Sequence, residues 1–343
     1  MYKIRLSILF RILMIRKLCD IDSQPEIIAG YGNLTIANCN YWGFKSRKQG
    51  GALYITSNCF QITIIDCNFY NCSSTEKSGA IHFASNNGMF NMSRVCANKC
   101  YSNEVMFAYV DVDFANRVKM SYTSILESNN INGSMVVHLH SSMVTGTHLN
   151  ETSSNTRQVS GFQIDMAESF QLNWINIINT YASYESMDFF MITAEIRYIN
   201  YVNNTIVHGG LFQYMNSNSS IISNAIVYDN KGPLVQMISS TLSISDSLIS
   251  HSVNLSGVGI TLERIKPFDH NNTYEIINYL SYPCFFTINH TQTSSSSKSN
   301  THIFFIMGSL LVLVLLSLKL VLDNQKRIFT ELTLNRTITD EFG

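Results

Sequence analysis

The sequence predicts an all-β fold, a parallel β-helix solenoid of about nine or ten coils followed by one C-terminal transmembrane helix. Three observations indicate it. Short apolar segments recur every 22–29 residues, one apolar run near the C-terminus is long enough to cross a bilayer, and no long helical pattern precedes residue 300. Repeats that cannot bury their apolar faces alone stack on one another and share a continuous core.

Residues 1–26 form an N-terminal segment that resembles a signal peptide only weakly. The start, MYKIRLSILFRILMIRKLCD, is positively charged and has apolar patches, but Arg11 splits the apolar run. A secretory signal has roughly 7–15 uninterrupted apolar residues. The segment is therefore either a weak signal or part of a chain whose true start lies upstream.

Residues 27–286 carry the repeat and are expected to form the β-helix ectodomain. Alternating apolar positions within each segment are typical of strands. An antiparallel sandwich also has short strands, but it gives no reason for a fixed period of this length. The residues expected to stack inward, one per coil, are Leu53, Ile81, Phe107, Val136, Phe162, Phe190, Phe212, Val235 and Ile260.

The cysteines fall in step with this period. Steps of 28 and 29 residues separate Cys39, Cys67 and Cys96, and 28 residues separate Cys72 from Cys100. Residues one coil apart lie about 4.8 Å apart, so we expect two stacked ladders, which pack best as buried thiols. The spacing also permits disulfides, whereas a zinc site among these cysteines has loose spacing. No partner is evident for Cys19, Cys59 and Cys284.

Three short motifs connect the repeat with known proteins. Gly50-Gly-Ala-Leu53, Gly79-Ala-Ile81 and Phe69-Tyr-Asn-Cys72 resemble the GGA[I/L/V] and FxxN-type repeats of chlamydial polymorphic outer membrane proteins. The stretch CNFYNC…SGAIHF…SRVCANKCYSNEVMFAYVDV is closer still to trichomonad surface proteins built on those repeats. The match covers about residues 34–115, although Cys72 replaces the Asn of FxxN. The resemblance implies a right-handed, pectin-lyase-like β-helix displayed at a cell surface, with a role in adhesion.

The C-terminal part predicts a membrane anchor. A Ser/Thr-rich stalk at 287–302 precedes the apolar run of 303–322, whose only charge is Lys319 near its end. Twenty residues in a helix match the roughly 30 Å hydrocarbon core. Positive residues gather after the span, in the tail of 323–343. The positive side is cytoplasmic, so we expect a single-pass type I plasma-membrane protein with its large domain outside.

Ten sequons of the form N-x-S/T precede the apolar run and support an extracellular location, because such acceptors suit an exposed secreted surface. The chain is also rich in Asn, Ser and Thr, so some sequons arise from composition alone. The predicted N-glycosylation sites are Asn33, Asn71, Asn91, Asn132, Asn150, Asn203, Asn218, Asn254, Asn271 and Asn289.

Catalytic signatures are weak. Polysaccharide hydrolases and lyases also occur among β-helices, and a glycosidase needs two carboxylates flanking the scissile bond. The fragments around His208 and at 264–266 lie two coils apart, and Asp111 and Asp113 lie about four coils from His208. His138 and His140 share a strand face without a third ligand. No phosphate-binding loop or nucleophile elbow occurs, so no catalytic, cofactor or metal site is expected.

The expected function is therefore non-enzymatic binding. Net charge is −1 without basic clusters, which argues against nucleic acid as a partner. Partners would be the membrane, through one span, and a host-cell protein or glycan recognised by the long faces of the solenoid. Two alternatives stay open: a membrane-tethered polysaccharide hydrolase or lyase, and a variable surface coat protein without a dedicated ligand.

Overall fold

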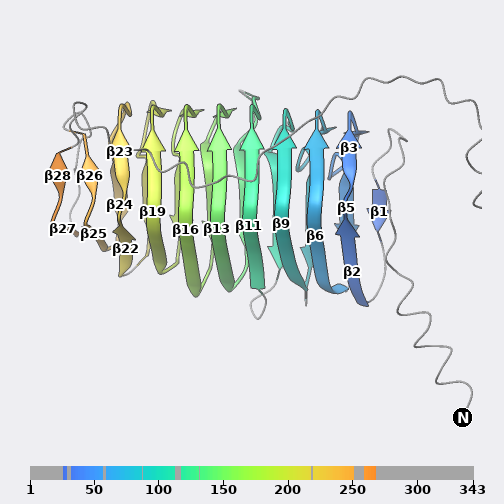
Figure 1. Cartoon of the computed structure of the whole chain (residues 1–343), viewed down its shortest axis with the longest axis horizontal. Coiled ribbons are helices and arrows are strands. Elements are labelled where there is room, and N and C mark those ends of the chain that lie inside the picture. Colours follow the sequence, from blue (N-terminus) through green and yellow to red (C-terminus); the bar gives the residue numbers. More distant parts are fainter. Residues whose placement is uncertain are drawn as a thin grey trace, which may run out of the picture. The chain divides into compact units, whose positions relative to one another are not determined.

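The computed structural model describes residues 26–28, 32–56, 59–86, 88–112, 117–130, 132–217, 219–250 and 259–267. These residues wind into a parallel β-solenoid of about eight turns (Figure 1), which confirms the all-β repeating fold. Within those ranges, no helix is long and apolar enough to cross a membrane. The predicted stalk, span and tail, and nearly all of the N-terminal segment 1–26, lie outside the described residues.

Each turn pairs with the next through parallel strands. Sheet A contains, in order, β1 (Glu26–Ile28), β5 (Leu53–Thr56), β8 (Ile81–Ser85), β10 (Val105–Val112), β12 (Met135–His140), β15 (Val159–Asp165), β18 (Met187–Phe190), β21 (Phe212–Met215) and β24 (Val235–Ile238). Sheet B contains β2 (Gly32–Ala37), β6 (Cys59–Tyr70), β9 (Met89–Asn98), β11 (Arg117–Leu126), β13 (Met143–Thr152), β16 (Ser169–Ile178), β19 (Ala194–Val202), β22 (Ser220–Ser223), β25 (Leu242–Ser245) and β27 (Ile260–Glu263).

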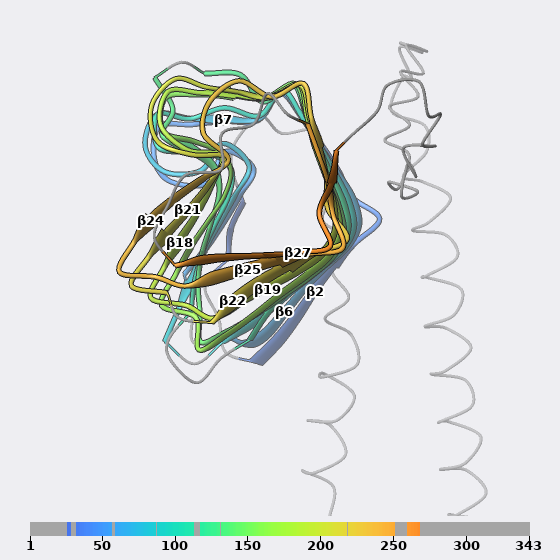
Figure 2. The same ribbon diagram turned by 90° about the vertical axis from the view of Figure 1, so that its left-hand side faces the viewer.

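Shorter strands complete each turn. Sheet B is extended by β3 (Asn40–Trp42), β23 (Ile226–Tyr228), β26 (Leu248–Ile249) and β28 (Lys266–Pro267). Two small sheets contain β4 (Lys45–Ser46) with β7 (Ser73–Ser74), and β14 (Asn155–Thr156) with β17 (Tyr181–Ala182) and β20 (Thr205–Ile206). Figure 2, which looks along the solenoid, shows successive turns lying over one another.

The core column of sheet A differs from the expected one at four positions, one of which is Ile260, because this residue lies in β27 of sheet B opposite Leu242. Ala108, Val137 and Met187 occupy it, where Phe107, Val136 and Phe190 were expected. Register shifts in the pairings of β10 with β12 and of β12 with β15 move the column, and Phe190 turns outward while Phe189 is buried. Bulges of this kind insert a residue without changing the apolar composition. The column is Leu53, Ile81, Ala108, Val137, Phe162, Met187, Phe212 and Val235.

The long strands of sheet B bend at one residue per turn that adopts the left-handed conformation. Non-glycine residues adopt it at a cost of about 1 kcal/mol, so interactions along the column must offset the cost. Two ion pairs between neighbouring turns help to offset this cost. Arg94 pairs with Asp66 at 2.6 and 2.8 Å in the first turns, and Arg264 pairs with Asp246 in the last described turns. We call this column the corner ladder, and its members with φ between 49° and 63° include Asp66, Arg94, Tyr122, His148, Trp174, Tyr198, Asn224, Asp246 and Arg264.

Candidate functional site

The outward face of sheet A carries a continuous row of planar polar and aromatic side chains. In β5, for example, Leu53 and Ile55 enter the core, so strand alternation turns Tyr54 outward. The equivalent position faces outward in every following turn. We call this set the outer row, and it consists of Tyr54, His82, Tyr109, His138, Gln163, Asp188, Gln213 and Gln236.

Neighbouring side chains partly cover the outer row. His82 is 3% exposed and Gln213 is 9% exposed although both point outward. Side chains from the preceding turns flank the row: the Lys77 ammonium lies 4.6 Å from the centre of the Tyr109 ring. Figure 2 shows the turns around β7 on one side of strands β18, β21 and β24. A ligand along the outer row would meet one side chain about every 4.8 Å.

The first half of the outer row is an aromatic surface. Ring centres of Tyr54 and His82 are 5.2 Å apart, and those of His82 and Tyr109 are 5.0 Å apart and nearly parallel. His138 follows edge-on at 5.0 Å from Tyr109. Burial, assisted by nearby Lys77, lowers the pKa of His82 to about 4. Burial, followed by the charge of Asp111, raises the pKa of Tyr109 to about 12.

The second half is a hydrogen-bonded network of carboxylates and amides. The His138 Nε2 atom lies 2.9 Å from Asp165 Oδ2 on the next turn. Gln163 donates to both carboxylate oxygens of Asp165 at 3.4 Å, and Gln213 donates to Asp188 at 3.3 Å. Because Gln163 and Gln213 are each held by a neighbouring carboxylate, these two side chains are already oriented before a ligand arrives.

A second row, two residues further along each strand, extends this polar surface. Tyr109 donates its hydroxyl to Asp111 Oδ2 at 3.4 Å, and His140 Nδ1 lies 3.7 Å from the other oxygen of Asp111. Asp111, His140 and Asp165 stand opposite one another on consecutive turns. Five titratable groups thus lie on three adjacent turns, although the described residues contain no cluster with the ligand set of a metal site.

The carboxyl groups of this surface differ in pKa: one is lowered and two are raised from their usual values. Burial alone would raise the pKa of Asp165, but its hydrogen bond and attraction to His138 hold the pKa below its usual value. Burial, with the charge of Asp165, raises the pKa of Asp188 to about 6. Burial, with the charge of Asp188, raises the pKa of Glu185 to about 7. An ionised carboxylate beside protonatable ones is the combination that acid–base catalysis uses.

Sequence reasoning missed Asp165, Asp188 and Glu185. Asp165 lies 20 residues before Glu185 and 23 residues before Asp188, and no sequence motif joins them. Asp165 is opposite Phe190 and Asp188 is opposite Gln163, so the two carboxylates are diagonal neighbours on one face. Such neighbours are about 7–8 Å apart at Cα, close enough for the charge of Asp165 to help raise the pKa of Asp188.

The corner ladder contains a second group of aromatic side chains. Rings of Tyr122 and His148 are 4.5 Å apart, those of His148 and Trp174 are 6.1 Å apart, and those of Trp174 and Tyr198 are 4.1 Å apart and parallel. The faces of the middle rings are therefore covered by their neighbours. Sugar rings stack on free aromatic faces, so this group stabilises the bend and offers a ligand only ring edges.

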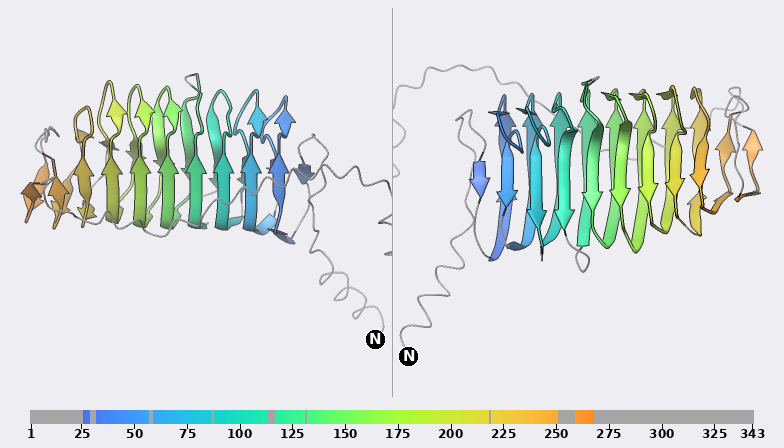
Figure 3. Two further views of the ribbon diagram at one scale, coloured as in Figure 1. Left: turned by 45° about the horizontal axis from the view of Figure 1, so that its top comes forward. Right: turned by 180° about the vertical axis from the view of Figure 1, so that it is seen from behind.

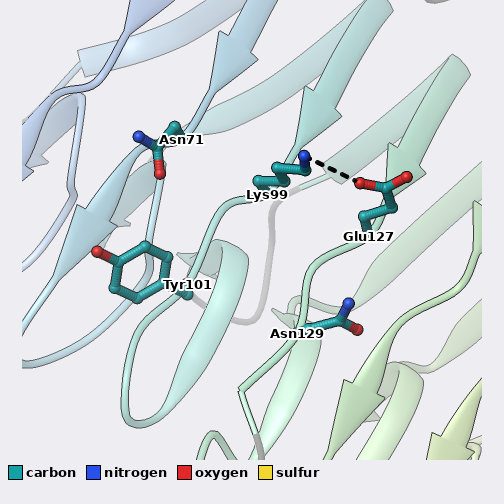
Figure 4. Close-up of a pocket in the computed structure, with 5 residues that line it drawn as sticks. All are labelled: Asn71, Lys99, Tyr101, Glu127 and Asn129. Carbon is teal, nitrogen blue, oxygen red and sulfur yellow. Dashed lines mark ion pairs between the residues drawn. The ribbon is translucent and has the colours of Figure 1, made fainter.

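A shallow hollow of about 250 Å³ lies at the other bend of the turn (Figure 4). An ion pair of 3.4 Å between Lys99 and Glu127 crosses it, and both side chains are about half exposed. Exposed pairs of this kind contribute little to stability or affinity. Asn71, a sequon acceptor, also lines the hollow, and a glycan there would fill it. We therefore assign it no ligand. Its lining is Asn71, Lys99, Tyr101, Glu127 and Asn129.

The predicted glycosylation sites that the structure describes all reach the surface. Asn33, Asn132 and Asn203 are exposed, and Asn71, Asn91 and Asn150 are partly exposed. Asn203 also donates a side-chain hydrogen bond of 2.7 Å to Asn179 on the previous turn. The remaining four acceptors, Asn218, Asn254, Asn271 and Asn289, lie outside the described residues.

The cysteine ladders differ in part from the expected ones. Cys72 and Cys100 are buried free thiols on adjacent turns and interact with each other. Cys39 is opposite Cys67, because the next residues Asn40 and Asn68 pair. Cys96, however, is opposite Asn68 and points away from the core. The shared period of 28 and 29 residues hid this shift of one position, which reverses the side of the strand.

The suggested hydrolase fragments do not come together. His208 is an exposed residue after β20, in ring contact with Tyr184. Arg264 pairs with Asp246 and Glu263 in the last described turns. Asp113 lies outside the described residues. His138 and His140 do not share a ligand, since each faces a different aspartate.

Comparisons with known proteins identify no relative. No family model, curated protein or solved structure matches the chain.

Proposed function

We propose that the chain is a single-pass type I surface glycoprotein whose extracellular β-solenoid, wound right-handed, binds a glycan along the outer row of sheet A. The proposal includes the transmembrane helix at 303–322 and the cytoplasmic tail that follows it. The observation that carries the binding function is the outer row itself, with eight planar side chains on consecutive turns. Binding here requires no chemistry beyond contacts that the row already offers.

The chemistry of the row favours a carbohydrate ligand. Hydroxyl-rich ligands are held by planar amides, carboxylates and imidazoles together with aromatic rings, and the outer row combines all four. The spacing of successive turns is comparable to the length of one sugar unit, so an oligosaccharide chain lying along the solenoid would present a similar unit to each turn. The partial burial of the row also lowers solvent competition for these hydrogen bonds.

A glycan array probed with the detergent-solubilised full-length protein tests this function. Replacing Gln163 by Ala removes one donor from the row and should weaken binding of any glycan hit about tenfold. The matched control is Gln171→Ala, because Gln171 is an exposed glutamine on sheet B. Equal effects of both variants would contradict a site on sheet A. Absence of binding to any glycan would favour the coat-protein alternative.

A second candidate function is polysaccharide cleavage, which the separated pKa values of Asp165, Asp188 and Glu185 favour. An ionised Asp165 would serve as base or nucleophile, and a protonated neighbour as the general acid. Release of reducing or unsaturated sugar ends from a polysaccharide panel is the measurement. Cleavage that Asp188→Asn abolishes would establish the enzyme, and binding without cleavage would exclude it for those substrates.

A further inference from the structure

The shallow hollow at the other bend of the turn is built by three consecutive turns of the solenoid. Asn71, Lys99 and Glu127 occupy this bend with φ angles of 52°, 55° and 48°. The turns are linked in step, since the backbone amide of Asn71 donates to Asn98 and that of Lys99 donates to Leu126. The three side chains therefore line one hollow from successive turns (Figure 4).

Tyr101 supplies the aromatic surface of the hollow. Ser73, two residues after Asn71, is opposite Tyr101 on the next turn. The backbone of Tyr101 is held on both sides, because its amide donates to Cys72 and its carbonyl accepts from Ser74. Its side chain is nevertheless 39% exposed. A fixed backbone thus presents an accessible ring on the turn next to Asn71.

Asn71 is also the acceptor of a sequon, Asn71-Cys72-Ser73. Among the described acceptors, Asn71 alone lines this hollow. Asn203 has a positive φ of 54° at the same bend of a later turn, but its side chain donates a hydrogen bond of 2.7 Å to Asn179. A sugar attached to the side-chain nitrogen of Asn71 starts within the hollow.

The lining matches N-acetylglucosamine, the first sugar of an N-glycan. A pyranose ring has an apolar face of C–H groups that packs on an aromatic ring such as that of Tyr101. Its hydroxyl and acetamide groups can bond the donors of Lys99 and Asn129 and the acceptors of Glu127 and Asn129. The volume of about 250 Å³ is smaller than the roughly 300–1,000 Å³ of pockets for drug-sized ligands, which suits a single sugar ring.

A covalent bond to Asn71 makes such a shallow site sufficient. An untethered sugar would have to offset the loss of its translational freedom on binding. The exposed ion pair of Lys99 with Glu127 contributes little toward that. A sugar attached at the rim has a high effective concentration in the hollow, so weak contacts are enough to hold it.

We propose that the first N-acetylglucosamine of a glycan on Asn71 packs on Tyr101, bonds Lys99, Glu127 and Asn129, and so links three consecutive turns. In the transfer, the Asn71 side-chain nitrogen loses a proton and bonds the anomeric carbon of a lipid-pyrophosphate-linked oligosaccharide. The lipid pyrophosphate leaves with the electron pair of the broken C–O bond. The proposal rests on the extracellular location in the proposed function, because N-glycans are added in the secretory pathway.

Glycopeptide mapping of the full-length protein, purified in detergent from its own membranes, establishes occupancy. The expected result is a glycan on the peptide that contains Asn71. An unmodified Asn71 in a protein with glycans at other acceptors overturns this inference alone. A protein without any N-glycan overturns this inference together with the surface glycoprotein of the proposed function.

Thermal unfolding of four proteins tests the contact: the unchanged protein, Asn71→Gln, Tyr101→Ala and the double variant. Asn71→Gln should lower the unfolding temperature by about 2–4 °C when Tyr101 is present, and by less than about 1 °C in the Tyr101→Ala background, where the sugar has no ring to pack on. Tyr101→Phe keeps the ring and should behave as the unchanged protein. An effect of Asn71→Gln that is equal with and without the ring overturns the proposal.

Amine labelling of Lys99 reports on the hollow itself. The Lys99 side chain is 51% exposed in the protein without glycan, so the sugar should shield it. Asn71→Gln should raise its labelling rate severalfold relative to Lys119, an exposed lysine on sheet B. The matched control is Asn132→Gln, because Asn132 is an exposed acceptor outside the hollow, and it should leave the rate unchanged. Equal rates in both variants overturn the proposal.

Discussion

The imidazole Nε2 of His138 lies 2.9 Å from a carboxylate oxygen of Asp165 on the next turn of the solenoid. This contact holds the pKa of Asp165 low against burial, and the resulting negative charge helps to raise the pKa of Asp188. One side-chain pair thus sets the charge pattern of the candidate site. The pattern also makes stability depend on pH.

We expect Asp188 and Glu185 to favour folding more at pH 5 than at pH 7.5, whereas His82, with a folded pKa of about 4, contributes in the opposite sense. A carboxyl group whose pKa is higher in the folded than in the unfolded state favours folding at low pH. This contribution is complete below the unfolded pKa and is lost as the pH rises through the folded pKa. Asp188, with a folded pKa of about 6, and Glu185, with about 7, both have this sign. The difference should be roughly 1–3 kcal/mol in urea unfolding. Asp188→Asn with Glu185→Gln should remove most of it; an unchanged pH profile in that double variant would contradict the assignment.

Gly79→Ala should destabilise the solenoid by about 3 kcal/mol. A Cβ atom at Gly79 would collide with the carbonyl of Met106 and lie 2.6 Å from the amide nitrogen of Tyr101, and backbone atoms cannot move aside. The close approach of turns explains why the GA pair recurs in the sequence. Gly146→Ala is the control, because its Cβ would meet only the ends of leucine side chains. Thermal unfolding of both variants measures the effect, and equal losses would refute the backbone explanation.

Trp174→Ala should cost about 2 kcal/mol, because Trp174 stacks on two neighbours of the corner ladder at 6.1 and 4.1 Å. Tyr122→Ala removes one stacked neighbour and an exposed ring, so it should cost less than half as much. Chemical denaturation of each variant gives the comparison. Glycan binding should be unaffected in both; a loss of binding in Trp174→Ala alone would move the site from sheet A to the corner ladder.

Glu151 should be uncharged in the folded protein. It stands between Ile125 and Ile177 in the core column of sheet B and is fully buried. Burial raises its pKa well above the usual range, and the nearby Ser154 hydroxyl offsets this only in part. Glu151→Gln should therefore change the free energy of unfolding by less than about 1 kcal/mol, whereas Glu151→Lys should cost at least about 3 kcal/mol. A Gln variant as unstable as the Lys variant would indicate a buried charge.

The period of the sequence was enough to predict the solenoid, because stacked turns require a fixed return length. Leu53 and Ile81 pair as expected. The register beyond them was not predictable, since bulges between Val105 and Ala108 and between Met135 and Val137 leave the apolar pattern unchanged.

The candidate site could not be found for the same reason. Asp165 and Asp188 become neighbours only when the register of β15 against β18 is known. Cys96 shows how small the difference is: one position moves it from a predicted core ladder to the outer surface of the wall. Both cases depend on pairing between turns, which residue spacing alone did not resolve.

Removal of N-glycans from the native full-length protein tests the central claim most directly. The account predicts a drop in apparent mass on a gel after glycosidase treatment, because described acceptors such as Asn33, Asn132 and Asn203 are exposed. External protease should then digest the solenoid on intact cells. An unchanged mass, together with a solenoid that external protease cannot reach, would place the domain inside the cell and contradict the account of a surface glycan-binding protein.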